Sequence, residues 1–193
     1  MNGGAPWLDE KVVALERAFR DAGLPHAFGG AIALAYYATP RGTHDVDVNL
    51  FVPASRLERV LAVLAPLGVA APDAAQRKAA ARDGQVRLHW NATPLDLFFA
   101  YDALHDACAE RRREVAFPGQ PLWILSAEDL AVLEVLFARE KDWRDLRELL
   151  FAQGERFDAA YASGWLERIL PDDDERLARF RALLPDAGDA SAH

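Results

Sequence analysis

The sequence contains a single cysteine, Cys108, among its 193 residues. An intrachain disulfide is therefore excluded, and so is a zinc site built from four cysteines. Cys108 stands in an apolar-periodic segment and has no neighbouring feature that would activate a thiol. We expect it to be a small buried side chain rather than a nucleophile.

Long apolar runs are also absent. No stretch approaches the roughly 18 apolar residues that a membrane-spanning helix needs. The N-terminal segment MNGGAPWLDEK lacks the basic stretch followed by an apolar one that marks a secretory leader. These absences predict a cytoplasmic protein with no membrane partner.

Basic residues are in the minority, with 22 Lys and Arg against 30 Asp and Glu and a net charge of −8. Residues 1–100 contain ten of each sign, so the whole negative excess lies in residues 101–193. A general nucleic-acid binder needs clustered Lys and Arg to contact phosphates. General nucleic-acid binding is therefore not expected, whereas a local site for a tRNA end stays open.

Apolar residues make up 51% of the chain, which is enough for a substantial core. Periodicity and breaker residues predict helices at 8–22, 31–38, 55–67, 127 onward, 143–152 and one or two within 155–185, and strands at 25–28, 45–52, 85–90, 95–101, 112–117 and 121–125. The predicted fold class is α+β, with an α/β core over 1–125, a helical region over 126–185 and a disordered tail over 186–193.

Gly29 and Gly30 stand between a short predicted strand and a predicted helix. Glycines let backbone N–H groups approach an anion closely, and a helix start offers unpaired N–H groups and a favourable dipole for phosphate. The same pair also fits an ordinary turn, so alone it is a weak indication.

Asp45 and Asp47 occupy alternate positions of the predicted strand DVDVNLFV and so point to one face. Their backbones lie about 6–7 Å apart, and two ionised carboxylates held that close repel each other. A divalent cation removes this cost, and Mg²⁺ commonly takes one or two carboxylates plus substrate phosphates. The alternative is a solvated strand face, but aspartate is depleted in strands. The pair therefore favours a metal site.

Asp96 is the one charge in the apolar segment PLDLFF. Because an unpaired buried charge is costly, this carboxylate needs a partner. An arginine, exposure at a strand edge and a shared metal site would each satisfy it, and the residues alone leave the three open.

The run from Gly29 to Phe51, GGAIALAYYATPRGTHDVDVNLF, resembles the active-site signature of the nucleotidyltransferase superfamily that includes DNA polymerase β. That signature is a Gly-Gly or Gly-Ser pair, a helix, and a strand with Asp-x-Asp. The segment RGT before Asp45 is most similar to a bacterial branch of AbiEii-type toxins, minimal nucleotidyltransferases and antibiotic nucleotidyltransferases. The helical segment from Ser126 to Leu146 resembles a helix pair of the AbiEii-like members. The fold that this implies is a nucleotidyltransferase-type mixed sheet flanked by helices and followed by a helical bundle.

The resemblance also implies a set of roles. Metal and catalytic residues would be Asp45, Asp47 and Asp96, with Asp96 also acting as base. Nucleotide-binding residues would be Gly29, Gly30, Arg41, Thr43 and Lys141. The cofactor would be Mg²⁺ or Mn²⁺, and an NMP group would pass from a nucleoside triphosphate to an acceptor hydroxyl on a small molecule, a protein or a tRNA end. A cognate toxin or antitoxin would be the protein partner.

Two positions depart from the family pattern. Gly30 stands where many relatives have serine, and Glu134 stands where relatives in this branch often carry a lysine. Two other readings therefore stay open. One is a non-catalytic nucleotidyltransferase-fold module, acting as a nucleotide sensor or as a toxin–antitoxin partner. The other is a metal-dependent phosphohydrolase that uses the same carboxylates.

Overall fold

The computed structural model describes residues 6–184, and the tail expected at 186–193 lies outside them. The chain divides into two compact units. One comprises residues up to 33 together with 41–126, and the other comprises 34–40 together with the residues from 127 onward. No helix in the described part is long and apolar enough to cross a membrane.

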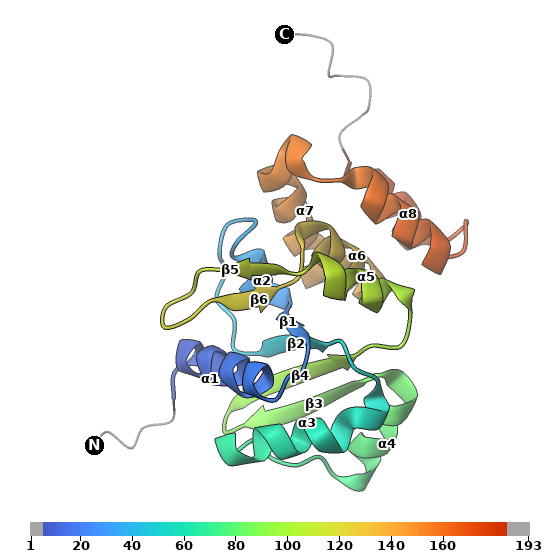
Figure 1. Cartoon of the computed structure of the whole chain (residues 1–193). Coiled ribbons are helices and arrows are strands. Elements are labelled where there is room, and N and C mark those ends of the chain that lie inside the picture. The colour runs from blue at the N-terminus through green and yellow to red at the C-terminus, as the bar shows by residue number, and fades with distance from the viewer. Residues whose placement is uncertain (1–5, 185–193) are drawn as a thin grey trace. The chain divides into compact units, whose positions relative to one another are not determined.

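The first unit is built around a mixed sheet (Figure 1). Its strands are β1 (His26–Phe28), β2 (Val46–Leu50), β3 (Gln85–Trp90), β4 (Thr93–Phe99), β5 (Arg113–Val115) and β6 (Leu122–Ile124). The strand order is β3-β4-β2-β1-β6-β5, in which β2 runs parallel to β4 and β1 parallel to β6, while the other neighbours are antiparallel. The predicted α+β class with a mixed sheet is confirmed.

Helices of the first unit are α1 (Leu8–Asp21), α2 (Gly30–Leu34), α3 (Leu57–Leu64), α4 (Ala74–Asp83) and α5 (Ala103–Arg111). Short 3₁₀ turns, η1 (Ala54–Arg56) and η2 (Ala65–Leu67), flank α3. Helices α4 and α5 were not predicted. The sequence of α4, AAQRKAAARD, has little amphipathic pattern. A local signal for it does exist: Asp73 accepts a hydrogen bond from Gln76 N at 2.8 Å as a helix cap, and Gly84 ends the helix with positive φ.

The two faces of the sheet differ in character. Val46, Val48 and Leu50 of β2 are buried on one face. On this face the ring of Phe19 of α1 packs at a tilt against His26 of β1, with ring centroids 5.1 Å apart. The buried ammonium of Lys11 adds a polar link from α1, since its Nζ donates to Trp90 O at 2.9 Å. The opposite face of β2 carries Asp47. Helix α1 therefore covers the apolar face and leaves the carboxylate on the other side.

The helix predicted at 31–38 is shorter than expected, and this prediction was wrong in length. Helix α2 ends at Leu34, whose carbonyl accepts both Tyr37 N–H and Ala38 N–H at 2.9 Å, which closes the helix with a turn. Pro40 follows, and the residue before a proline disfavours helical backbone angles.

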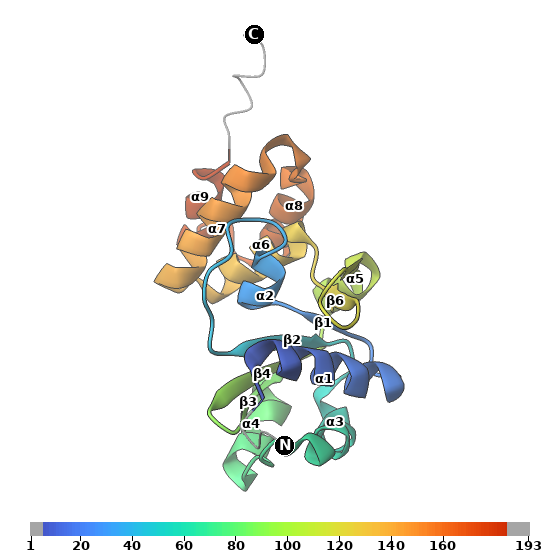
Figure 2. The same ribbon diagram turned by 90° about the vertical axis from the view of Figure 1, so that its left-hand side faces the viewer.

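The second unit contains four helices in the described part, and Figure 2 shows them packed together. They are α6 (Ala127–Phe137), α7 (Glu140–Gln153), α8 (Ala159–Ile169) and α9 (Glu175–Arg181), with a 3₁₀ turn η3 (Gly154–Arg156) after α7. The predicted C-terminal helical bundle is confirmed.

An acidic pair is buried between α6 and α7 within this second unit. Glu134 is 7% exposed and Asp142 is 1% exposed. Asp142 Oδ2 accepts from Arg139 N at 3.0 Å and from Arg139 Nε at 2.7 Å. Glu134 Oε2 has no hydrogen-bond partner among residues 6–184. Burial raises the pKa of Glu134 to about 9, and the charge of Asp142 and its hydrogen bond to Glu134 add to the rise. Glu134 is therefore a neutral acid at pH 7.

Candidate active site

Two of the candidate carboxylates are direct neighbours across the sheet. Strands β2 and β4 lie side by side (Figure 1). They pair in parallel, with Asp47 opposite Asp96 and Val46 opposite Leu95. Register partners in a sheet point to the same face. Asp45 immediately precedes β2 and shares the face of Asp47 by alternation. The topology therefore brings Asp45, Asp47 and Asp96, which are up to 51 residues apart in sequence, onto one sheet face.

The glycine pair lies on the β1 side of Asp47. Gly29 N–H donates to Asp47 O at 3.0 Å, and a Cβ at Gly29 would lie 2.9 Å from Asn49 Nδ2. Gly30 has φ +49°, and a Cβ there would be in hard contact with Asp47 Oδ2 and 2.9 Å from its Cγ. Neither glycine position therefore has room for a side chain, because Asn49 and Asp47 already occupy the space. Ala33 N–H bonds back to Gly29 O, so the N–H groups of residues 30–32 precede the first bond of α2.

Substitution of Gly30 by alanine is expected to disturb the Asp47 carboxylate more than the fold. Positive φ costs a non-glycine residue about 1–2 kcal/mol, and the new methyl group would force Asp47 out of its present rotamer. We expect a loss of about 1–2 kcal/mol in unfolding free energy, and metal-dependent triphosphate binding weakened at least about tenfold. Urea unfolding and calorimetric titration would measure the two effects.

Gly42→Ala is the matched control, because a Cβ there meets nothing within 4 Å and its backbone is not left-handed. Equal triphosphate binding by Gly30→Ala and Gly42→Ala would show that the close approach of Gly30 to Asp47 has no role in binding.

Asp96 has an arginine partner. Arg87 of the adjacent strand β3 lies opposite Asp96, and its Nε and Nη2 donate to the two carboxylate oxygens at 2.7 and 2.6 Å. The hydrogen bonds and charge of Asp96 raise the pKa of Arg87 above its ordinary value, and the charges of Asp45 and Asp47 add to the rise. One cation therefore experiences all three carboxylates. The side chain of Asp96 is 15% exposed and that of Arg87 is 54% exposed, so the pair is open to solvent.

Thr43 lies beside Asp45. Its hydroxyl donates a short hydrogen bond to Asp45 Oδ1, and it lies 3.3 Å from Asp45 O. This side chain therefore orients the first carboxylate. Arg41 begins the same loop, and its Nη1 contacts Gly42 O at 3.4 Å.

Lys141, the remaining predicted nucleotide-binding residue, is in the first turn of α7 and belongs to the second compact unit. The structure therefore brings together Gly29, Gly30, Thr43, Asp45, Asp47 and Asp96 within the first unit. Among residues 6–184, no group of three or more His, Cys, Asp or Glu side chains is gathered closely enough to hold a metal ion unaided.

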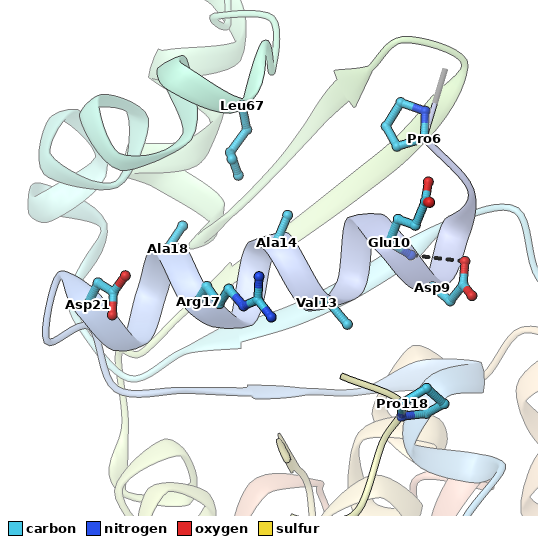
Figure 3. A pocket seen from close by; sticks show the side chains of 10 residues that line it. All are labelled: Pro6, Asp9, Glu10, Val13, Ala14, Arg17, Ala18, Asp21, Leu67 and Pro118. Carbon is cyan, nitrogen blue, oxygen red and sulfur yellow. Dashed lines mark hydrogen bonds between the residues drawn. The ribbon is translucent and has the colours of Figure 1, made fainter. Parts of the chain in front are cut away.

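A groove of about 730 Å³ lies elsewhere in the first unit, along the outer face of α1. Figure 3 shows Leu67 on one side of the helix and Pro118 on the other, with Val13, Ala14 and Ala18 along it. Because α1 covers the apolar face of the sheet, this groove is on the side away from Asp47. It is not part of the carboxylate site.

Residues 7–161 match the model of a family described as uncharacterised nucleotidyltransferases. The chain belongs to this nucleotidyltransferase family. None of the curated proteins matches the sequence at a significant level.

Solved structures support the same fold. The chain is similar to the solution structure of the antibiotic-resistance factor ANT(2″)-Ia, with a TM-score of 0.60 and 17% identity over 83% of this chain and 94% of that one. For the crystal structure of ANT(2″)-Ia in complex with adenylyl-2″-tobramycin, the TM-score is 0.59 and the identity is 18%, over 90% of this chain and 96% of that one. For a nucleotidyltransferase-like protein from Paracoccidioides brasiliensis, the TM-score is 0.50 and the identity is 17%, over 89% of this chain and 92% of that one. At these identities the similarity shows the fold alone.

Two residues near the candidate carboxylates were not singled out from sequence. Asn49 is buried against Gly29, and Arg87 holds Asp96. A signal for Arg87 was present, because buried Val86 and Leu88 flank it in an alternating strand. This alternation places Arg87 on the polar face, where Asp96 needed a partner.

Proposed function

We propose that the chain is a metal-dependent nucleotidyltransferase that transfers an NMP group from a nucleoside triphosphate to an acceptor hydroxyl. The observation that carries the proposal is the pairing of Asp47 with Asp96 across β2 and β4, with Gly30 packed closely against the Asp47 carboxylate. Asp45 lies on the same face, and the family membership agrees with this chemistry.

The donor atoms suit Mg²⁺ or Mn²⁺. Three carboxylates supply hard oxygen ligands, and Mg²⁺ is usually held by one or two carboxylates together with substrate phosphates rather than by a complete protein cage. Asp45 and Asp47 would hold the metal, and Asp96 would join them after leaving Arg87. When bound, the metal neutralises phosphate charge and stabilises the attacking and leaving oxygens.

The protein residues would then divide the remaining work. Backbone N–H groups at Gly30 and the start of α2 would bind the triphosphate. Gly29 N–H already donates to Asp47 O, so Gly29 would contribute by having no side chain, which lets the backbone approach the phosphates. Thr43 would keep Asp45 oriented through its hydroxyl. Arg41 would bind phosphate oxygens as a cation. Lys141, which belongs to the other compact unit, remains a candidate for phosphate binding on the sequence alone.

In the reaction, the acceptor oxygen forms a bond to the α-phosphorus of the triphosphate. The bond from that phosphorus to the bridging oxygen breaks, and its electron pair leaves with pyrophosphate. The hydroxyl proton passes to Asp96 as general base. Positioning of the two reactants supplies most of the remaining rate acceleration.

The acceptor is a small molecule, a protein or a tRNA end, and the small molecule has the most support. ANT(2″)-Ia, whose fold is similar, was crystallised with adenylyl-2″-tobramycin, which supports a small hydroxyl compound as acceptor but leaves the charge of the acceptor of this chain open. The excess of acidic residues argues against a long nucleic-acid acceptor. A cognate toxin or antitoxin is the protein partner that we propose on the resemblance to AbiEii-type proteins.

One observation favours a second candidate, a catalytically degenerate module that binds nucleotide or a toxin–antitoxin partner without turnover. Glu134 stands where related proteins often carry a lysine, and it is buried beside another acid. A lysine that bound phosphate from this position would have no counterpart here.

Titration calorimetry with each of the four ribonucleoside triphosphates, in Mg²⁺ and in EDTA, tests the proposal. We expect one triphosphate to bind in Mg²⁺ only, and Asp45→Asn to lose that binding without a change in unfolding free energy. Absence of binding by all four would contradict the proposal. Binding without pyrophosphate release in the presence of small-molecule, protein and tRNA acceptors would support the degenerate module, and release of inorganic phosphate would support a phosphohydrolase.

A further inference from the structure

Strand β3 extends the carboxylate face beyond Asp96. It is an edge strand (Figure 1). Its exposed residues Gln85, Arg87 and His89 alternate with buried Val86 and Leu88. Because Arg87 is the register partner of Asp96, and Asp96 of Asp47, the three form one row across β3, β4 and β2. The row ends in a cation at the open edge of the sheet.

The two ends of this row differ in what lies beside them. Gly30 approaches Asp47 from the β1 side, whereas Arg87 lies on the far side of Asp96. With about 4.8 Å between neighbouring strands, β3 is about 10 Å from β2. On the proposed function, the triphosphate lies at Gly30. Attack in line with the departing pyrophosphate therefore brings the acceptor in over Asp96 and β3.

Arg87 cannot keep its present bonds during such a reaction. Both oxygens of Asp96 accept from its guanidinium, and Asp96 is the only acceptor that Arg87 has among residues 6–184. Once Asp96 turns to a metal ion or to an acceptor hydroxyl, at least one of the two hydrogen bonds is lost. The side chain is 54% exposed and has room to turn towards solvent.

A guanidinium released in this way can hydrogen-bond to water or to an anion bound beside it. Its planar fork of N–H donors matches the oxygens of a phosphate or carboxylate and binds them in pairs. It would repel a cationic group brought to the same place. The position of Arg87 therefore selects for acceptors by charge.

We propose that Arg87 is an acceptor-binding residue that exchanges Asp96 for an anionic group of the acceptor, so that the enzyme acts on hydroxyl compounds carrying a phosphate or carboxylate near the reacting hydroxyl. This inference rests on the proposed function and names the class of its acceptor.

The test measures binding of three matched probes: glycerol, glycerol 3-phosphate and glycerate. They are titrated onto the protein saturated with Mg²⁺ and the α,β-methylene analogue of the triphosphate that binds. We expect the wild-type protein to bind one or both anionic probes at least about tenfold more tightly than glycerol. The stronger of the two identifies phosphate or carboxylate as the group recognised. Arg87→Gln is expected to lose this preference, and Arg87→Lys to keep part of it.

Arg82→Gln is the matched control. Arg82 forms a similar two-bond pair with Asp83, at 2.6 and 2.7 Å, but at the end of α4. It should keep the full preference. Equal binding of the three probes by the wild-type protein would overturn the inference. A preference that survives in Arg87→Gln would also overturn it. If that variant also loses triphosphate affinity, Arg87 serves the donor instead of the acceptor.

Failure of the proposed function gives a different result. If no triphosphate binds the wild-type protein, that proposal fails by itself. The three probes are then titrated with Mn²⁺ alone, which still competes with Arg87 for Asp96. A preference for the anionic probes that depends on both Mn²⁺ and Arg87 would support the role of Arg87, and its absence would overturn it.

Discussion

Asp96→Asn is expected to lower the rate of pyrophosphate release by about 10²–10⁴-fold, the usual contribution of a general base. Asparagine cannot take up the acceptor proton, and its neutral amide is a weaker metal ligand than a carboxylate. Triphosphate binding should change by less than about tenfold, because Asp45, Asp47 and the backbone at Gly30 are unchanged. Stopped assays of pyrophosphate, with water and with hydroxyl acceptors, would give the rate, and calorimetry would give the affinity.

The substitution also removes the partner of Arg87, so that a control must separate catalysis from ion pairing. Asp83→Asn breaks the similar pair with Arg82 in a solvent-exposed place. We expect it to leave both rate and affinity unchanged. If Asp96→Asn keeps the wild-type rate, Asp96 serves to hold Arg87 and is not the base.

Glu134→Gln should make the protein more stable, with the gain growing as pH rises. The pKa of Glu134 is about 9 in the folded protein against an ordinary 4.5. Between these values the folded state holds a proton that the unfolded state has lost. The stability that this proton provides is complete below pH 4.5, and it declines by about 1.4 kcal/mol per pH unit up to pH 9. Glutamine does not titrate, and its amide can still donate to Asp142.

At pH 8 we expect Glu134→Gln to raise the unfolding free energy by about 3–5 kcal/mol. Urea unfolding at half-unit steps from pH 5 to 9 would measure both the gain and the change in slope. Glu148→Gln changes an exposed glutamate on α7 and should have little effect. Identical pH slopes for the wild-type and Glu134→Gln proteins would show that the Glu134 carboxyl is ionised in the folded state.

Local patterns in the sequence were sufficient for the elements that carry the candidate site. Alternation placed Asp45 and Asp47 on one face of a predicted strand, which is present as β2. The short strand predicted before the glycine pair is β1, and the pair leads into α2. These features depend on neighbours within a few residues, so the sequence expresses them directly.

Long-range pairing could not be obtained in the same way. Asp96 was left with three alternative partners, and the structure shows Arg87 beside it and Asp47 across from it. The parallel pairing of β2 with β4 joins segments about 50 residues apart and is decided by the packing of the whole sheet. Glu134 is buried because α6 packs against α7, and no local sequence pattern predicts that packing.

The close approach of Gly30 to Asp47 also limits how this chain can evolve. Serine is frequent at this position in related proteins, yet here its Cβ would collide with the Asp47 carboxylate and its φ would be strained. Serine could enter only after Asp47 and the turn had shifted, so positions 30 and 47 are epistatic. A side chain at position 30 should therefore cost less in a background where the Asp47 carboxylate already takes another rotamer.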